Sequence, residues 1–452
     1  REEISAEHMR KTESEAEKID YRLLYAGAID LGFTLDEVLP RLPSLEIPSP
    51  FFVEIPTSQG SLIVSAGKDD IYKKEDILLI MDLSGDDVYE KGGGAEGERL
   101  PVSLIIDVSG NDRYEQRGFF RIGGACLGYA GVLDLSGDDR YSGDFVSQGA
   151  GIFGVGWLMD FAGKDSYKAD AFSQGSGTFG IGILSDFTGD DVYEAFQAIQ
   201  GYGGILGSGL LLDVEGNDQY IANDEDIRYP SPQSREHNAN LAQGMGMGKR
   251  ADYIDGHSRA GGIGILVDGK GDDVYSCGVF GQGTSYWYSI GILYDEEGND
   301  MYKGVWYVQG STAHFGFGML VDVAGDDRYE AKLNMAQGAG HDLGIGILHD
   351  YSGNDIHIAP NLSLGAGNAN GIGLFMDASG ADTYQVSSQI SLGRAAGVKD
   401  SLRQWMKTLG IFLDLGNGED TYSGHPEARN DAFWKLPGTN ELPSELSIGI
   451  DE

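Results

Sequence analysis

Residues Gln174 to Tyr193 read QGSGTFGIGILSDFTGDDVY, and most of the chain repeats this stretch with variations. The pattern D-x-x-G-x-D-x-Y begins here at Asp186 and occurs twelve times, mostly at intervals of 25 to 28 residues. Two longer intervals, of 55 and 37 residues, are either one period plus an insertion or two periods with one worn away. A worn copy, Ala66 to Tyr72, precedes the first full motif. A fixed period with turn-forming residues in the same place each time is typical of a solenoid.

Each repeat predicts two or three short strands. The apolar stretch Ile181-Gly-Ile-Leu184 reads as the first strand, and a second short strand follows the tyrosine and ends in Gln-Gly. Glycine recurs four residues before the leading aspartate, as at Gly182, where we expect the opposite wall of a narrow coil to come close. Glycine three residues after that aspartate is expected to supply a positive φ. A propeller blade needs about 40 residues, so the sequence predicts an all-β repeat fold: a parallel β-helix, or β-solenoid, of about 12–13 coils.

Stacked coils turn the repeated residues into columns. Eleven of the twelve full motifs end in Tyr, and His357 is the exception. We expect the tyrosines to stack and the glutamines to bond coil to coil as an amide ladder. An exposed tyrosine row that stacks on sugar rings is the alternative.

The repeats occupy only part of the chain. Residues 1–47 predict an α-helical N-terminal cap: one amphipathic helix, then a second helix that a capping box at Thr34–Glu37 opens and Pro40 ends. A docking helix for a partner is the alternative. Prolines mark residues 48–60 as a linker before the repeats, which span 61–422. Insertions are expected at 221–242, 247–261 and 394–407, the last as a helix, and 423–452 is expected to be an extended or poorly ordered tail.

The acidity of the chain belongs to the repeat. The net charge is −39, and the motifs contribute 24 + 6 = 30 carboxylates, without which the charge would be −39 + 30 = −9. This placement argues against nucleic acid as a partner and favours cations. No apolar run is long enough to span a membrane.

The repeated aspartates are the candidate metal ligands. Coils about 4.8 Å apart bring like charges together, at a cost of about 1 kcal/mol per pair even in water. Carboxylates and turn carbonyls are the oxygen ligands that Ca²⁺ takes, and Mg²⁺ ranks second because it keeps its waters. Asx-turns that face water without an ion are the alternative. The twelve leading aspartates are Asp82, Asp107, Asp134, Asp160, Asp186, Asp213, Asp268, Asp295, Asp322, Asp350, Asp377 and Asp414. The twelve terminal aspartates are Asp87, Asp112, Asp139, Asp165, Asp191, Asp218, Asp273, Asp300, Asp327, Asp355, Asp382 and Asp420.

The motif resembles part of a known calcium-binding repeat. G-[DN]-D-x-Y, as in Gly110-Asn-Asp-Arg-Tyr114, is similar to the second half of the repeat of RTX calcium β-roll proteins. In that family the aspartate and loop carbonyls hold Ca²⁺ between turns, and secreted chains fold on meeting calcium. The resemblance implies ligands at Asp112, Asp139, Asp191, Asp218, Asp273, Asp300, Asp327 and Asp355. The repeat departs from the family in its longer period, its missing double glycine and its extra leading aspartate.

Two functions follow as hypotheses. The first is a non-catalytic extracellular, cell-surface or periplasmic protein, a calcium-stabilised rod that serves as a spacer, adhesin or assembly subunit. The second is a β-helix enzyme, a lyase or hydrolase acting on an acidic polysaccharide near the 221–261 insertions. Its candidate binding residues are Arg235, His237, Arg250, His257 and Arg259. Solvated surface residues are the simpler interpretation of these five side chains.

Overall fold

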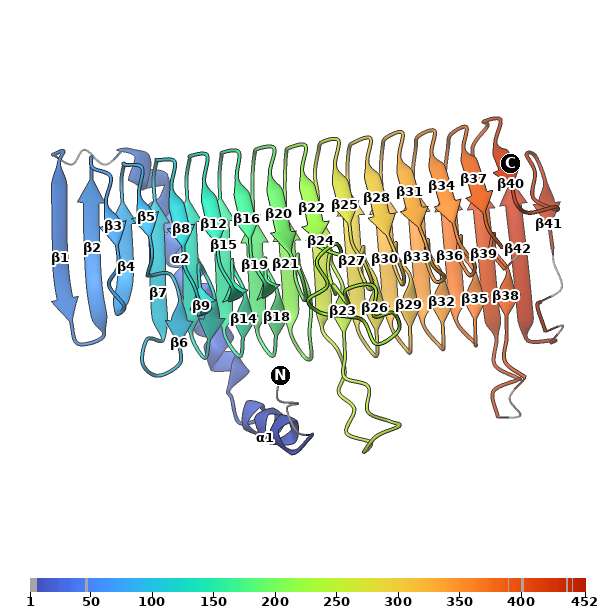
Figure 1. The fold of residues 1–452 in the computed structure, drawn as a ribbon, viewed down its shortest axis with the longest axis horizontal. Helices are drawn as coiled ribbons and strands as arrows, with labels where there is room; N and C mark the ends of the chain where they lie inside the picture. Colours follow the sequence, from blue (N-terminus) through green and yellow to red (C-terminus); the bar gives the residue numbers. More distant parts are fainter. Residues whose placement is uncertain (1–5, 45–47, 389, 400–401, 436–437, 441) are drawn as a thin grey trace.

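The computed structural model describes residues 6–44, 48–388, 390–399, 402–435, 438–440 and 442–452. The chain forms an elongated parallel β-solenoid in which each coil adds one strand to a long sheet on either side (Figure 1). The predicted fold class is confirmed, and the second-longest sheet contains 13 strands, in agreement with 12–13 coils.

Four groups of strands, here called sheets A to D, build the rod. Sheet A has the order β1 (Phe51–Thr57), β2 (Gly60–Ala66), β4 (Ile77–Asp82), β7 (Val102–Asp107), β11 (Tyr129–Asp134), β15 (Val155–Asp160), β19 (Ile181–Ser185), β21 (Ser208–Leu212), β24 (Ile263–Val267), β27 (Ile290–Asp295), β30 (Phe317–Asp322), β33 (Ile345–Asp350), β36 (Ile372–Asp377), β39 (Thr408–Asp414), β42 (Glu445–Asp451) and β41 (Phe433–Trp434). Sheet B has the order β3 (Ile71–Tyr72), β5 (Val88–Tyr89), β8 (Arg113–Glu115), β12 (Arg140–Ser142), β16 (Ser166–Lys168), β20 (Val192–Ala195), β22 (Gln219–Ala222), β25 (Val274–Ser276), β28 (Met301–Gly304), β31 (Arg328–Ala331), β34 (Ile356–Ala359), β37 (Thr383–Val386) and β40 (Thr421–Ser423).

Two shorter groups complete the wall. Sheet C consists of one run with β6 (Ala95–Glu96), β10 (Ala125–Cys126), β14 (Gly151–Ile152) and β18 (Gly177–Thr178), and of a second run with β23 (Gly246–Met247), β26 (Ser285–Tyr286), β29 (Thr312–Ala313), β32 (Gly340–His341), β35 (Gly367–Asn368) and β38 (Ala395–Ala396). Sheet D contains β9 (Phe119–Arg121), β13 (Phe145–Ser147) and β17 (Ala171–Ser173).

Strand register places equivalent residues directly above one another. In sheet A the leading Asp295 pairs with Asp322, and Asp322 pairs with Asp350. In sheet B Tyr141 pairs with Tyr167. The motif residues therefore form vertical files along the rod, as the repeat predicts.

Glycine is required at two repeated positions of the coil because backbone atoms come too close there for a side chain. A Cβ on Gly182 would lie 2.0 Å from the carbonyl oxygen of Ser176, which confirms that the walls nearly touch there. Of the twelve glycines of the acidic turn, only Gly85 (150°) and Gly271 (149°) have the positive φ expected from the sequence, so the expectation is wrong for the other ten. At Gly189 the reason is steric instead, because a Cβ would lie 2.0 Å from the carbonyl oxygen of Gly163 one coil earlier.

The tyrosine file lies in the core. Tyr141, Tyr167 and Tyr193 are fully buried, and neighbouring rings stack with centroids 4.7–4.8 Å apart. The predicted stack is confirmed, and the alternative of an exposed row for sugar binding is wrong because these rings face inward.

The glutamine file holds coils together differently from the prediction. Gln148 donates from Nε2 to the backbone carbonyls of Tyr141 (2.9 Å) and of Lys168 in the next coil (3.0 Å). Gln174 donates to the carbonyl of Tyr167 in the same way. The expected amide-to-amide ladder is therefore wrong, since these amide nitrogens satisfy backbone carbonyls.

Helix α2 (Tyr21–Val38) lies along the flank of the rod, whereas α1 (Ala6–Ala16) lies beyond the lower edge of the strands in this view (Figure 1). The short 3-10 helix Leu39–Ser44 follows α2. Asp20 caps α2 by accepting from the amides of Arg22 and Leu23, and the helix continues through Thr34, so the expected second start there is wrong. Leu31 and Leu35 pack on Leu133 and Trp157 of sheet A. These contacts cover the side of the rod, whereas the sequence predicted a cover for its end; residues 1–5 and 45–47 lie outside the described part.

Both edges of sheet A recruit segments for which the sequence predicted no strand. Within the expected linker, β1 pairs antiparallel with β2, and an edge strand tolerates Pro56. Within the expected tail, β42 pairs in parallel with β39. Open backbone groups at a sheet edge make such pairing favourable. In the 394–407 insertion the described residues contain β38 and a turn at 402–405 where a helix was expected, and 400–401 lie outside the described part. Neither helix found in the described residues has the length and apolarity to cross a bilayer.

Candidate functional site: a buried double file of aspartates

The two aspartates of each motif lie at the two ends of the acidic turn, inside the wall of the rod. A leading aspartate ends its sheet A strand or directly follows it, and the terminal aspartate immediately precedes the next sheet B strand. All twelve leading aspartates are buried, and so are eleven of the terminal ones; Asp420 is half-buried. The repeat therefore places 23 of its 24 candidate ligands away from water.

Ten of the twelve leading aspartates accept a hydrogen bond from a tyrosine of the preceding coil, whereas Asp377 and Asp414 accept one from Tyr384 and Tyr422 of their own coil. Tyr167 donates to Oδ2 of Asp186 at 2.5 Å, and Tyr193 donates to Oδ2 of Asp213 at 2.7 Å. Equivalent bonds join every coil from Tyr72 to Asp350. The tyrosine file thus serves both as a packed core and as one wall of the acidic site.

Each terminal aspartate accepts a backbone hydrogen bond from the preceding coil. The amide of Asp165 donates to Oδ1 of Asp191 at 2.6 Å, and the same contact runs from Asp70 to Asp420 at 2.5–2.7 Å. This ladder fixes the direction of every terminal carboxylate.

In eleven of the twelve terminal aspartates one buried oxygen has no hydrogen-bond partner among the described residues. These Oδ2 atoms belong to Asp87, Asp112, Asp139, Asp165, Asp191, Asp218, Asp273, Asp300, Asp327, Asp355 and Asp382. Oδ1 of seven leading aspartates is unpartnered in the same sense, namely in Asp186, Asp213, Asp268, Asp295, Asp322, Asp377 and Asp414. A buried acceptor left unpaired costs about 1–3 kcal/mol, and more when it is charged.

Carboxylate oxygens of the leading and terminal aspartates converge between coils. Oxygens of Asp112, Asp134 and Asp139 lie within 4.8 Å of one another, and Asp139, Asp160 and Asp165 repeat the arrangement one coil further along. Each group combines a leading aspartate with the terminal aspartates of its own and the preceding coil. The sequence-predicted ligands are therefore brought together, three at a time.

The acidic file contains no cationic side chain to balance it. The ion pairs of the described residues include none between a lysine or arginine and any of the 24 aspartates. Burial accordingly raises the pKa of all 24 carboxyls, for example to about 8 for Asp165 and Asp213 and to about 10 for Asp273. The site must bind protons or metal cations to be tolerated in the fold.

The middle position of the turn shows a different pattern. It is exposed, and over ten successive coils it reads Asp86, Asn111, Asp138, Lys164, Asp190, Asn217, Asp272, Asn299, Asp326, Asn354, so that aspartates occupy only alternate coils. Backbone amides bond to these side chains from coil to coil as well. In the exposed file the sequence separates like charges, whereas in the buried files it does not.

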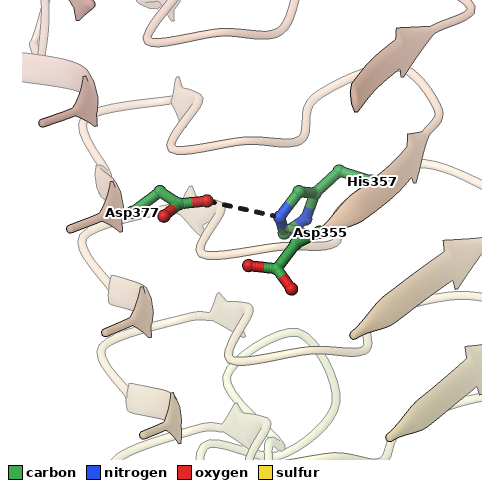
Figure 2. A group of neighbouring side chains, drawn as sticks. All are labelled: Asp355, His357 and Asp377. Carbon is green, nitrogen blue, oxygen red and sulfur yellow. Dashed lines mark ion pairs between the residues drawn. The ribbon is translucent and has the colours of Figure 1, made fainter. Parts of the chain in front are cut away.

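One coil differs from the rest. His357 takes the place of tyrosine and stacks between Tyr329 and Tyr384, with ring centroids 4.6 and 5.2 Å away. It is fully buried, and burial lowers its pKa to about 3. Nε2 faces Oδ2 of Asp377 at 3.8 Å, too far for a hydrogen bond, with Asp355 beside both (Figure 2).

The five predicted binding residues do not form one site. Arg235 is exposed, His237 contacts Asp224 (2.5 Å), and His257 lies 3.4 Å from Asp255. Arg259 pairs with Glu13 and Glu17 of the N-terminal segment, while Arg250 contacts His314 on the second run of sheet C. The two insertions thus engage different parts of the molecule.

A second polar cluster was not predicted from the sequence. His314 lies between Asp342, 2.5 Å from Nδ1, and Arg250, 2.7 Å from Nε2. Arg403, from the third insertion, also donates to Asp342 and holds the pKa of that carboxyl at about 2 together with His314. Both ring nitrogens of His314 are engaged, so the cluster provides no free base. No sequence motif links these residues, because they come from four separate segments of the chain.

Comparison with protein families, with curated proteins and with solved structures finds no match for this chain. The resemblance to RTX calcium-binding repeats therefore stays a prediction based on five or six residues per coil.

Proposed function

We propose that the chain is a non-catalytic rod whose buried aspartate files hold a row of divalent cations, with Ca²⁺ as the preferred ion. The observation that carries this proposal is the repeated unpartnered carboxylate oxygen, buried beside two other carboxylates and without a cationic side chain. Because the same buried charge recurs from coil to coil, a cation that neutralises one coil would neutralise the others in the same way.

The donor set favours a hard cation. The groups of Asp112, Asp134 and Asp139 and of Asp139, Asp160 and Asp165 offer carboxylate oxygens alone, which suit Ca²⁺ and Mg²⁺. Ca²⁺ accepts irregular geometry and six to eight oxygens, so turn carbonyls can join the carboxylates. Mg²⁺ needs near-octahedral geometry and keeps several waters, which a fully buried file accommodates less easily.

Shared protons are the competing means of neutralisation. Two carboxyls that share one proton form a strong hydrogen bond, and the raised pKa values are compatible with this state in the absence of metal. The two possibilities differ in their response to chelator, to calcium and to pH, and these responses provide the test.

The rod would act as a calcium-stabilised spacer, adhesin or assembly subunit at a cell surface or outside the cell, where calcium is abundant. The regular sheets and in-register files supply stiffness, and the insertions supply local surfaces for a partner. The alternative of a polysaccharide-cleaving enzyme stays a prediction from the sequence, since the five basic residues on which it depends are dispersed.

The test is thermal unfolding of the full chain after metal removal, with increasing calcium, followed by circular dichroism. Bound calcium is counted in parallel by equilibrium dialysis. We expect several ions per chain and a melting temperature that rises with calcium and falls with chelator, because a ligand that binds only the folded state stabilises it. No change in melting temperature and no bound calcium would overturn the proposal in favour of protons.

A further inference from the structure

We propose that Asp355, His357 and Asp377 form a single site for a zinc-type transition-metal ion, chemically distinct from the other coils of the rod. The three side chains converge in the interior, His357 and Asp355 from the sheet B side and Asp377 from sheet A (Figure 2). This inference does not depend on calcium binding elsewhere.

The first step is the gap that histidine leaves. From Tyr72 to Tyr329 each tyrosine hydroxyl of the file reaches the leading aspartate of the next coil; Tyr329, for instance, donates to Asp350 at 2.6 Å. Histidine is shorter, and its Nε2 stops 3.8 Å from Oδ2 of Asp377. A proton cannot bridge that distance as a hydrogen bond.

The second step is the unpartnered set of atoms. Among the described residues, neither ring nitrogen of His357, nor Oδ1 of Asp377, nor Oδ2 of Asp355 has a hydrogen-bond partner. All three residues are 0–1% exposed. An imidazole and two carboxylates are therefore aimed at one another in a dry interior, at the cost that unpaired buried polar groups carry.

The third step is the size of the gap. Zinc bonds nitrogen and carboxylate oxygen at roughly 2.0–2.2 Å, so two ligand atoms around a tetrahedral ion lie about 3.4 Å apart. The observed 3.8 Å needs a closure of only about 0.4 Å. The ion would lie between Nε2 of His357 and the carboxylate of Asp377, whose Oδ2 also accepts a 3.0 Å hydrogen bond from the hydroxyl of Tyr384.

The fourth step is ligand preference. Imidazole suits zinc, cobalt, nickel and copper, whereas Ca²⁺ takes oxygen ligands only. Replacing one hydroxyl by one nitrogen donor therefore changes which ion the coil selects. Stacking between Tyr329 and Tyr384 holds the ring in the plane that this coordination requires.

The experiment uses Co²⁺ as a spectroscopic probe for zinc. The full chain is stripped of metal, saturated with calcium and titrated with Co²⁺ while the visible d–d absorption is recorded. We expect one equivalent of Co²⁺ to give bands that Zn²⁺ abolishes, because calcium does not occupy a nitrogen-containing site.

The decisive variant is His357→Tyr, which restores the residue of the other eleven coils and should fold. It should lose the cobalt bands and the single zinc ion while keeping the circular dichroism spectrum. His349→Tyr, at a half-buried histidine of sheet A, is the matched control and should keep both. Absence of cobalt bands in the unaltered chain, or bands unchanged in His357→Tyr, would overturn the inference. Failure of the calcium test with the cobalt bands intact would refute only the proposed function.

Discussion

Replacing Asp191 by asparagine should stabilise the rod in chelator and destabilise it in calcium. Oδ1 of Asp191 accepts the amide of Asp165 at 2.6 Å, a role that an asparagine oxygen can keep. Its buried Oδ2 is one of the unpartnered oxygens and would become an amide nitrogen. The substitution therefore removes one negative charge and one potential metal ligand while leaving the ladder intact.

The magnitude follows from the spacing of the coils. Charges about 4.8 Å apart repel by about 3.5 kcal/mol at an effective dielectric constant of 20. Asp191 has terminal neighbours on both sides, Asp165 and Asp218. Without metal, bound protons already relieve part of this repulsion, so we expect asparagine to stabilise by about 1–3 kcal/mol. With calcium, the loss of one partner of a buried charge pair should cost about 3 kcal/mol.

The assay is urea unfolding followed by circular dichroism, performed in calcium and in chelator for each variant. Asp190→Asn is the matched control, since the neighbouring Asp190 is exposed and belongs to the middle file. Its midpoint should change by the equivalent of less than about 0.5 kcal/mol in either buffer. An Asp191→Asn variant that is destabilised equally in both buffers would refute the reasoning, because the change in unfolding free energy would then not depend on calcium.

Three further predictions concern the same scaffold. Tyr193→Phe leaves Asp213 without its 2.7 Å hydrogen bond and should cost about 2–3 kcal/mol in urea unfolding, whereas the same change at the half-exposed Tyr288 should cost less than about 0.5 kcal/mol. Gly182→Ala should lower the melting temperature sharply, because the new Cβ would lie 2.0 Å from a backbone oxygen. The control is Gly32→Ala in α2, where nothing lies within 4 Å of the new Cβ, and it should stabilise the chain by about 1 kcal/mol. Equal effects of the two substitutions would contradict the steric explanation. In chelator, the free energy of unfolding should fall as pH rises from about 4 to 8, because the folded chain keeps carboxyl protons that the unfolded chain has already lost. The pKa of Asp213, for example, is about 8. The expected fall is about 1.4 kcal/mol per pH unit for each such carboxyl. Calcium should reverse that trend, since protons compete with the ion for the carboxylates; parallel melting curves in the two buffers would count against the ion.

The sequence alone predicts the structure of each coil, but it does not predict how the segments outside the repeats pack against the solenoid. The period, the turn glycines and the alternating aspartate and tyrosine predict the files directly, since each residue type recurs at a fixed distance along the chain. The flank position of α2 depends on apolar residues such as Trp157 that point outward from sheet A, and no local pattern pairs Leu31 with them. Likewise β1 and β42 form because open sheet edges accept them, although Pro56 in β1 and Pro443 just before β42 locally favour irregular structure.

The candidate site was likewise predicted only where its residues recur with the period of the repeat. The 24 aspartates follow from the repeat, but their burial does not, because a charged residue in a turn is ordinarily exposed. The importance of His357 could have been read from the single break in the tyrosine column. The cluster of His314, Asp342 and Arg403 had no such signal.

The composition of the buried files favours the proposed cations over shared protons. If the terminal aspartate were needed only to accept a backbone amide and share a proton, asparagine would serve as well, since its oxygen accepts and its nitrogen donates without any charge. The chain itself demonstrates this at its last rung, where Asn430 accepts the amide of Asp420 at 2.6 Å. In the exposed middle file, where repulsion in water is only about 1 kcal/mol per pair, asparagine or lysine separates the aspartates over ten coils. In the buried terminal file, where repulsion is several times larger, twelve coils in succession use aspartate. A residue that is more costly than its neutral isostere at each of twelve positions is best explained by a requirement for its charge, and a metal cation needs that charge whereas a hydrogen-bond ladder does not.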